Sequence, residues 1–413
     1  MANSALSLHG PIGVQDNRNE LINGDFNIWQ RGITTSVGVT GKASTTCLQN
    51  SFVADRWRIY SQAVNGVTAP PLSLFRTKMP LGYPAGADRA SKWYLNIHVG
   101  PTASTGAAHM GHNNVGGFTG AGATTDGSFA ALVQDIDDVG TLEGKTCIIS
   151  FWAKSDISNQ RVAPVLKQCF AGGTAATLLI AGSTGHLGHT LDNTWRQYKT
   201  SFNVPSIQGQ PLDGPGALEF GSSGDDALQV QLILHANSGK AGTGVTFELG
   251  GPGHAGKTGN ISFSQIQIEQ GSRSTEFDKT NPMTEVALCQ RYYEKSYNLD
   301  DAPGTNTNRG AIGLSDPSIN PTCHQNTYYS TRKRATLPTV VLYDIAGTPG
   351  NIYVRHAQNH NNTNIVGNAG WISESGFGRV DVESTHHLGT YSGGDTLINF
   401  QYTADAELSV DTD

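Results

Sequence analysis

Hydrophobic and polar residues alternate with a period of two along most of the chain. The pattern is clear in SFVADRWRIY (51–60), KWYLNIHV (92–99), TWRQYKTSFNV (194–204) and ALQVQLILHA (227–236). KTCIISFWAKS (145–155) has the composition of a strongly apolar strand. Turn-forming residues separate these segments, and no helical pattern of ten or more residues lies between them. The pattern therefore predicts an all-β protein built on a β-sandwich.

The segment ISFSQIQIEQGSRSTEFDKT (261–280) carries the same alternation into a turn. Ile266 and Ile268 alternate with Gln265, Gln267 and Glu269, which predicts one buried face and one solvated face. The residues GSRSTEF are expected to return the chain toward the segment that follows.

One segment departs from the β pattern. Asn281 is suited to cap a helix, and Pro282 is suited to its first turn. Apolar residues then recur at helical spacing. The residues expected to contact the β-units or other subunits are Val286, Leu288, Tyr292, Tyr293 and Tyr297. The spacing predicts a connector helix of three to four turns over 282–297, packed between two β-units.

These features divide the chain into four parts. Residues 1–19 read as an extended N-terminal arm that lies along a partner or along another part of the chain. Residues 20–280 form the large β-unit, with a Gly-rich insertion at 100–128. Residues 281–298 contain the connector helix, and 299–413 form a second, smaller β-unit.

Composition narrows the classes of function. The chain has 413 residues, of which 15% are charged, and its net charge is −7. It has no long basic run, so we expect no nucleic-acid partner. It has no apolar run near the ~18 residues of a membrane span and no N-terminal secretory signal, so we expect synthesis in the cytoplasm of the producing cell. Five cysteines without a CxxC pair (47, 147, 169, 289 and 323) are expected to be buried free thiols.

Metal-binding and catalytic patterns are weak. Two HxxH pairs, His109 with His112 and His186 with His189, lie in Gly-rich segments without a third ligand nearby, so exposed loop histidines are the preferred interpretation. Asp135, Asp137 and Asp138 lack the regular spacing of a calcium loop, which favours a strand edge or solvated turn. There is no nucleophile elbow, no Walker motif and no pair of carboxylates that stands out. We therefore predict no enzyme activity, no catalytic residue and no metal site.

Six tryptophans raise the question of sugar binding, because aromatic faces stack on sugar rings. Most of them lie within alternating strands and are expected in the core, as is Trp57 in ADRW (54–57). Trp371, in GNAGWISESG, is flanked by small polar residues. We predict Trp371, and next Trp29, as the exposed candidates for contact with a glycan.

Several motifs carry a family resemblance. They are LINGDFNIWQRG (21–32), ADRW (54–57), ISFWAKS (149–155), QIQIEQGSRSTEFD (265–278), LCQRYYEKS (288–296) and NFQYTADAEL (399–408). In this order they resemble a family of virion proteins of tailed bacteriophages, which includes tail-fibre, head-fibre and capsid-decoration proteins. The resemblance implies a jelly roll like that of carbohydrate-binding modules, followed by a small β-domain, often in trimers. A structural calcium ion remains open through this resemblance alone.

The resemblance implies a non-enzymatic structural protein of the virion. It would be attached to capsid or tail subunits by its N-terminal arm, and it would display its β-units outward, as a homotrimer. Two alternatives stay open at this point. One is an adhesin that recognises a glycan on the host surface, and the other is a polysaccharide depolymerase, which would need paired carboxylates across a groove.

Overall fold

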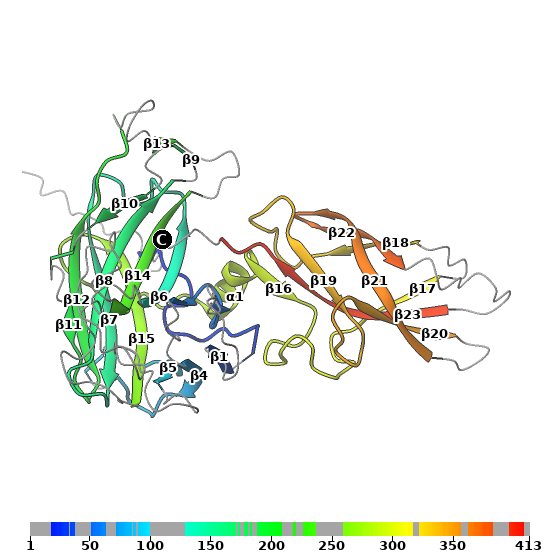
Figure 1. Cartoon of the computed structure of the whole chain (residues 1–413), viewed down its shortest axis with the longest axis horizontal. Coiled ribbons are helices and arrows are strands. Elements are labelled where there is room, and N and C mark those ends of the chain that lie inside the picture. Colours follow the sequence, from blue (N-terminus) through cyan, green and yellow to red (C-terminus); the bar gives the residue numbers. More distant parts are fainter. Residues whose placement is uncertain are drawn as a thin grey trace, which may run out of the picture.

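The protein consists of two β-units with a single helix between them among the described residues (Figure 1). This computed structural model describes residues 18–32, 34–37, 51–62, 72–84, 86–87, 90–99, 129–170, 172–173, 177–180, 182–183, 188–208, 218–219, 226–236, 259–316, 322–356, 362–382 and 396–408. The N-terminal arm up to residue 17, the insertion at 100–128, and His109, His112, His186 and Cys47 lie outside these residues.

The first sheet of the large unit has the order β1-β4-β5-β15-β7-β12. Its strands are β1 (Thr34–Val37), β4 (Leu72–Lys78), β5 (Trp93–Val99), β15 (Gly259–Gln270), β7 (Thr146–Ser155) and β12 (Arg196–Asn203). All neighbours in this sheet pair antiparallel.

The second sheet of the large unit has the order β10-β8-β14-β6-β3-β2. Its strands are β10 (Thr177–Ile180), β8 (Arg161–Cys169), β14 (Ala227–Ala236), β6 (Phe129–Asp137), β3 (Arg58–Gln62) and β2 (Ser51–Phe52), with β11 (His189–Thr190) paired to β8. A separate pair is formed by β9 (Gly172–Gly173) and β13 (Leu218–Glu219). From β5 to β8, and again from β12 to β15, the long strands alternate between the two sheets. This is the jelly-roll β-sandwich, and the predicted fold class is confirmed.

The core of the sandwich is made by apolar side chains from both sheets. It includes Leu95 and Phe263 of the first sheet and Leu132 and Leu232 of the second. Trp57 is fully buried in the same cluster, as predicted, and its indole nitrogen donates to the Asn23 carbonyl at 3.0 Å. The indole therefore fills the core and needs no water, because its polar atom has a backbone partner.

The smaller unit is organised around its last strand. Its elements are β16 (Tyr293–Lys295), β17 (Ile312–Asp316), β18 (Thr322–Tyr328), β19 (Thr339–Tyr343), β20 (Asn351–His356), β21 (Asn362–Ser373), β22 (Gly376–Val382) and β23 (Thr396–Asp405). β23 pairs with β16, β17, β19 and β20, and the sheet continues through β21 and β22 to β18. A separate apolar cluster, which includes Ile352, Phe377, Phe400 and Tyr402, forms its core.

The connector helix is shorter than predicted. α1 spans Pro282–Gln290, and Asn281 caps it by accepting a bond from the Met283 backbone nitrogen at 2.9 Å. The predicted continuation to 297 is wrong, because Tyr293 begins β16 and pairs with Asp405 of β23. The competing hydrogen bonds of a sheet end the helix there.

The predicted burial of the helix needs a second correction. The buried residues of α1 are Glu285 and Cys289, whereas Val286 and Leu288 are only half-buried. Tyr292, Tyr293 and Tyr297 are buried, but they lie after the helix. The apolar residues spaced like a helix over 282–297 therefore belong to three elements: a short helix, a turn and the strand β16.

The solvated face predicted for β15 is also wrong. Gln265, Gln267 and Glu269 are as buried as Ile266 and Ile268. Their polar atoms form hydrogen bonds with other segments of the same chain. Gln265 bonds to Ser91, Gln267 to the backbone nitrogen of Asp278, and Glu269 to Thr275. The turn at 271–278 folds back over this face and replaces water as its hydrogen-bonding partner.

Candidate functional site: the junction between the two β-units

The two β-units meet at a junction built from four segments. These are the N-terminal segment 18–32, the connection 53–57 between β2 and β3, the segment from α1 through β16, and the residues 405–408 at and after the end of β23. Figure 1 shows α1 and β16 between the two units, with the chain after β23 returning toward the large unit. The bonds below show how these segments hold one another.

Asn23 and Asp55 fix the N-terminal segment at the junction. Asn23 adopts a φ of 59°, and its side-chain amide donates to the carbonyls of Ile28 at 2.9 Å and of Asp55 at 3.0 Å. The Asp55 carboxylate accepts from the backbone nitrogen of Gln30 at 2.9 Å and from its Nε2 at 2.6 Å. The same Nε2 donates to the Tyr293 carbonyl in β16 at 2.7 Å. These bonds connect the large unit directly to the first strand of the smaller one.

Two arginines of the large unit bind two carboxylates at the end of the smaller one. Arg31 lies 3.1 Å from Asp405 Oδ2 and 3.3 Å from Glu407 Oε1, and Arg56 donates to the other Glu407 oxygen. The side chains of Arg56 and Glu407 are only 2% and 3% exposed. Burial raises the pKa of Glu407, and the two arginines oppose this shift. Removing one partner of such a buried pair leaves a charge without compensation, which is strongly destabilising.

Two of the three tyrosines predicted as contact residues cover these arginines. The Arg56 guanidinium carbon lies 3.4 Å from the centroid of the Tyr292 ring, and that of Arg31 lies 3.6 Å from the Tyr293 ring. Each stack combines cation–π attraction with burial of the arginine stem. The Tyr292 hydroxyl also donates to Asp137 at 2.8 Å, and burial raises the pKa of Tyr292 to about 12. Tyr292 and Tyr293, which lie between the end of α1 and the start of β16, therefore contribute to holding the two units together.

Two further carboxyl groups are buried where α1 meets the N-terminal segment. Glu285 accepts a bond from the Asn23 backbone nitrogen at 3.0 Å. Burial and the nearby Asp25 raise the pKa of Glu285 to about 8. Burial also raises the pKa of Asp25, although Lys279 and a bond from Asn27 oppose the shift. The Glu285 carboxyl is therefore neutral over much of the range in which an ordinary glutamate is charged.

The aspartates considered for a calcium site serve three separate purposes. Asp135 binds Arg58 at 2.7 Å and accepts from Gln229 at 2.8 Å, Asp137 contacts the junction, and Asp138 forms a tight turn with a φ of 72°. Within the described residues, no group of three or more His, Cys, Asp or Glu side chains is arranged to hold a metal ion. The interpretation as a strand end and turn fits Asp137 and Asp138, but it is wrong for Asp135, which is buried in β6 between β14 and β3.

The structure separates the two tryptophans predicted as glycan contacts. Trp29 is fully buried, and its indole nitrogen donates to the Phe26 carbonyl at 2.8 Å, so the prediction of exposure is wrong. The junction turn that begins at Asn23 folds Trp29 into the core of the sandwich. Trp371 is 62% exposed and lies in β21 of the smaller unit, which agrees with the expected exposure.

His189 is half-buried, and the three cysteines whose side chains are described are buried. His189 lies in β11, shares a hydrogen bond of 2.9 Å with Thr200 and packs against Tyr198, so the expectation of an exposed loop histidine is wrong for this residue. Burial lowers its pKa. Cys147, Cys169 and Cys289 are buried free thiols, as predicted. Burial raises the pKa of Cys147 to about 12, which keeps it protonated and unreactive.

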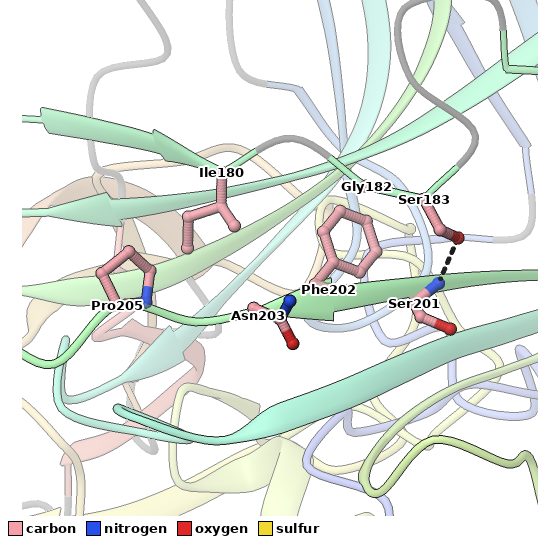
Figure 2. Close-up of a pocket in the computed structure, with 7 residues that line it drawn as sticks. All are labelled: Ile180, Gly182, Ser183, Ser201, Phe202, Asn203 and Pro205. Carbon is pink, nitrogen blue, oxygen red and sulfur yellow. Dashed lines mark hydrogen bonds between the residues drawn. The ribbon is translucent and has the colours of Figure 1, made fainter.

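A cavity of about 410 Å³ lies where β10 and β12 approach each other at the edges of the two sheets (Figure 2). It is lined by Ile180, Gly182, Ser183, Ser201, Phe202, Asn203 and Pro205. Ser183 Oγ accepts a bond from the Ser201 backbone nitrogen at 3.0 Å, which ties the two edges together. None of the described residues that line it has a titratable side chain.

The sequence interpretation missed the charged residues of the junction. Arg31, Glu285 and Glu407 were not singled out, because charged residues are usually exposed and nothing local shows which of them will be buried. One signal was present: Asp405 and Glu407 lie among apolar residues at the end of the motif NFQYTADAEL (399–408).

No protein-family model matches the chain, and no curated protein sequence matches it. Among solved structures, the chain is similar to the enzymatically active domain of tailspike protein 4 of bacteriophage CBA120. The two share 12% identity with a TM-score of 0.29, over 62% of this chain and 22% of that one. The chain thus spans less than a quarter of this neighbour.

Two further neighbours are covered almost completely. A putative sugar-binding protein from Bacteroides thetaiotaomicron has 12% identity and a TM-score of 0.29, over 61% of this chain and 100% of that one. A family 11 carbohydrate-binding module of a cellulosomal cellulase of Clostridium thermocellum has 13% identity and a TM-score of 0.27, over 57% and 99%. With these low scores, the fold assignment depends on the strand order described above.

Proposed function

We propose that the protein is a non-enzymatic structural protein of a tailed-phage virion, a fibre or decoration subunit that displays two β-units in a fixed relative orientation. One observation supports this most directly. Five of the six motifs that resemble phage virion proteins contribute to the junction or bond to it, through Gln30, Asp55, Ile266, Tyr293 and Glu407. A display subunit needs such a rigid connection between its parts.

The attachment function is assigned to the N-terminal arm. Its last residues are held by the fold: the Arg18 backbone nitrogen donates to Asp278 at 2.8 Å, and Asn19 bonds to the backbone of Ile266 and Ile268. Residues 1–17 precede this anchor and would bind a neighbouring capsid or tail subunit by strand addition. Homotrimeric assembly belongs to the same proposal, with the exposed side chains Leu81 and Met283 as contact candidates.

Deletion of residues 1–17 tests the proposal, because it leaves Arg18 and Asn19 in place. The deleted protein should remain folded and soluble and should no longer join particles. The full chain should be present in purified particles at a stoichiometry set by a symmetry axis. A full chain absent from particles, or a deleted chain that still joins them, contradicts the proposal.

Glycan binding is the second candidate, and the exposure of Trp371 favours it. A depolymerase has less support, since none of the described residues that line the cavity between β10 and β12 is a carboxylate. Release of reducing sugar from host capsule or lipopolysaccharide by the purified protein would establish that activity and contradict the non-enzymatic assignment.

A further inference from the structure

The smaller unit carries an exposed aromatic side chain on β18 and another on β21, the two strands that flank β22 (Figure 1). We name this surface the aromatic face and define it by Asn326, Tyr328, Trp371, Arg379 and Asp381. Tyr328 is 72% exposed and Trp371 is 62% exposed. The core side of the same strands is closed by Phe377 and Val380, so the aromatic face plays no part in the core.

Trp371 adopts a backbone conformation that its side chain disfavours. Its φ is 55°, in the left-handed region, where a bulky residue is an outlier. The strand pairing places it between the pairs Gly370–Arg379 and Ile372–Phe377. A strained residue with a large exposed side chain does not serve stability, and such residues gather at binding sites.

Two glycines make room for the ring and for the neighbouring cation. A Cβ atom at Gly378 would lie 3.2 Å from Cε3 of Trp371 and 3.1 Å from Oδ1 of Asn326. A Cβ atom at Gly370 would lie 2.8 Å from Nε of Arg379. The Trp371 ring therefore rests against the bare backbone of β22, with the Asn326 amide on the other side of Gly378.

Polar groups surround the ring. The Arg379 guanidinium carbon lies 5.4 Å from the Trp371 ring centroid, and Arg379 pairs with Asp381 at 2.7 Å. The Asn326 amide donates to the Tyr328 hydroxyl at 3.4 Å. The face thus combines two aromatic rings with amide, hydroxyl and guanidinium donors and a carboxylate acceptor, while the ion pair keeps its local charge balanced.

We propose that the aromatic face binds an uncharged polysaccharide. The apolar side of a hexose ring would stack on Trp371, a second ring would contact Tyr328, and sugar hydroxyls would bond to Asn326 and to the Arg379–Asp381 pair. An exposed aromatic patch with polar groups at its edge is the expected form of a ligand surface. The balanced charge favours a neutral glycan over a polyanionic one. This site is separate from the sandwich, and it does not depend on whether the chain is a virion protein.

Affinity electrophoresis of the full chain tests the proposal. The gels would contain neutral glucans, mannans or galactans, with a polyuronate for comparison. We expect retardation by at least one neutral polysaccharide, with little dependence on salt because no net charge is neutralised. Trp371→Ala should weaken binding at least tenfold, and Gly378→Ala should weaken it several-fold by displacing the ring. Circular dichroism would show that both variants are folded.

Leu337→Ala is the matched control. Leu337 is a 74% exposed apolar side chain of the same unit outside the aromatic face, so its truncation should leave binding unchanged. Absence of binding to every neutral polysaccharide overturns the proposal, as does binding that survives Trp371→Ala. If the full chain binds no glycan and Trp371→Ala changes its oligomeric state, the proposal is overturned and the aromatic face is a contact with a second copy of the chain.

Discussion

The junction and the aromatic face show two opposite uses of polar and aromatic side chains. At the junction, Arg56 and Glu407 are buried together and the Tyr292 ring covers the arginine. At the aromatic face, the Trp371 ring is exposed beside an ion pair that is itself partly exposed. The first arrangement excludes water and holds two units together, and the second leaves its groups available to a ligand.

The family resemblance follows the same division. The motifs at 21–32, 54–57, 288–296 and 399–408 all contribute residues to the junction, whereas Trp371 and Tyr328 lie in none of them. Residues of these four motifs therefore help to join the two units. The ligand preferred by a particular chain would be set by residues outside those motifs.

The largest effect is expected from Glu407→Gln. This change removes the charge that compensates Arg31 and Arg56, so the free energy of unfolding should fall by about 3–5 kcal/mol. Thermal unfolding followed by calorimetry should change from one transition to two as the units lose their coupling.

Arg196→Gln is the control for Glu407→Gln, because Arg196 forms an exposed ion pair with Asp192. Its loss should cost at most about 1 kcal/mol. Equal effects of the two variants would mean that burial at the junction does not set the strength of the pair.

Glu285→Gln should change how stability depends on pH. The folded pKa of about 8 exceeds the ordinary value of 4.5, so the folded state binds more protons between these values. The contribution of Glu285 to stability is full below pH 4.5 and is lost as pH rises through 8. Unfolding curves at pH 5 and pH 9 should show a smaller decline in the variant, by up to about 4 kcal/mol, since roughly three pH units separate pH 5 from the folded pKa and each corresponds to about 1.4 kcal/mol. The same decline in both proteins would rule out Glu285 as its source.

Asn281→Ala tests the cap of the helix between the units. The variant loses the side-chain acceptor for the Met283 backbone nitrogen, which should lower the free energy of unfolding by about 1 kcal/mol. Asn281→Ser keeps an acceptor and should unfold close to the parent in urea. A serine variant as unstable as the alanine variant would show that the cap is not the cause.

An effect of similar size is expected at the aromatic face. Trp371→Gly relieves the left-handed backbone, which Trp371→Ala retains, so the glycine variant should be the more stable of the two by about 1 kcal/mol. Both should bind polysaccharide equally poorly. Denaturation midpoints of the pair measure the strain separately from binding, and identical midpoints would show that the backbone at this position is unstrained.

The sequence was most informative where local pattern decides structure. Period-two alternation predicted the strands of the sandwich, and the Asn–Pro start of α1 was identified correctly. It failed where distant segments decide. The helix ends at Gln290 because β23 pairs with Tyr293, and Gln267 is buried because a turn folds over it. Trp371 was found because its neighbours are small and polar, whereas Arg379 and Tyr328 join it only through the pairing of three strands.

The central position of β23 has a consequence for biosynthesis. Its residues Thr396–Asp405 pair with four other strands, and Glu407 lies two residues after its end. Domains generally fold in order as the chain leaves the ribosome. The sandwich strands emerge early, but the smaller unit has no central strand until almost all of its residues are translated. A nascent chain stalled before position 396 would therefore expose the unpaired edges of the strands that β23 joins. Chaperones could bind these edges, and other chains could aggregate on them.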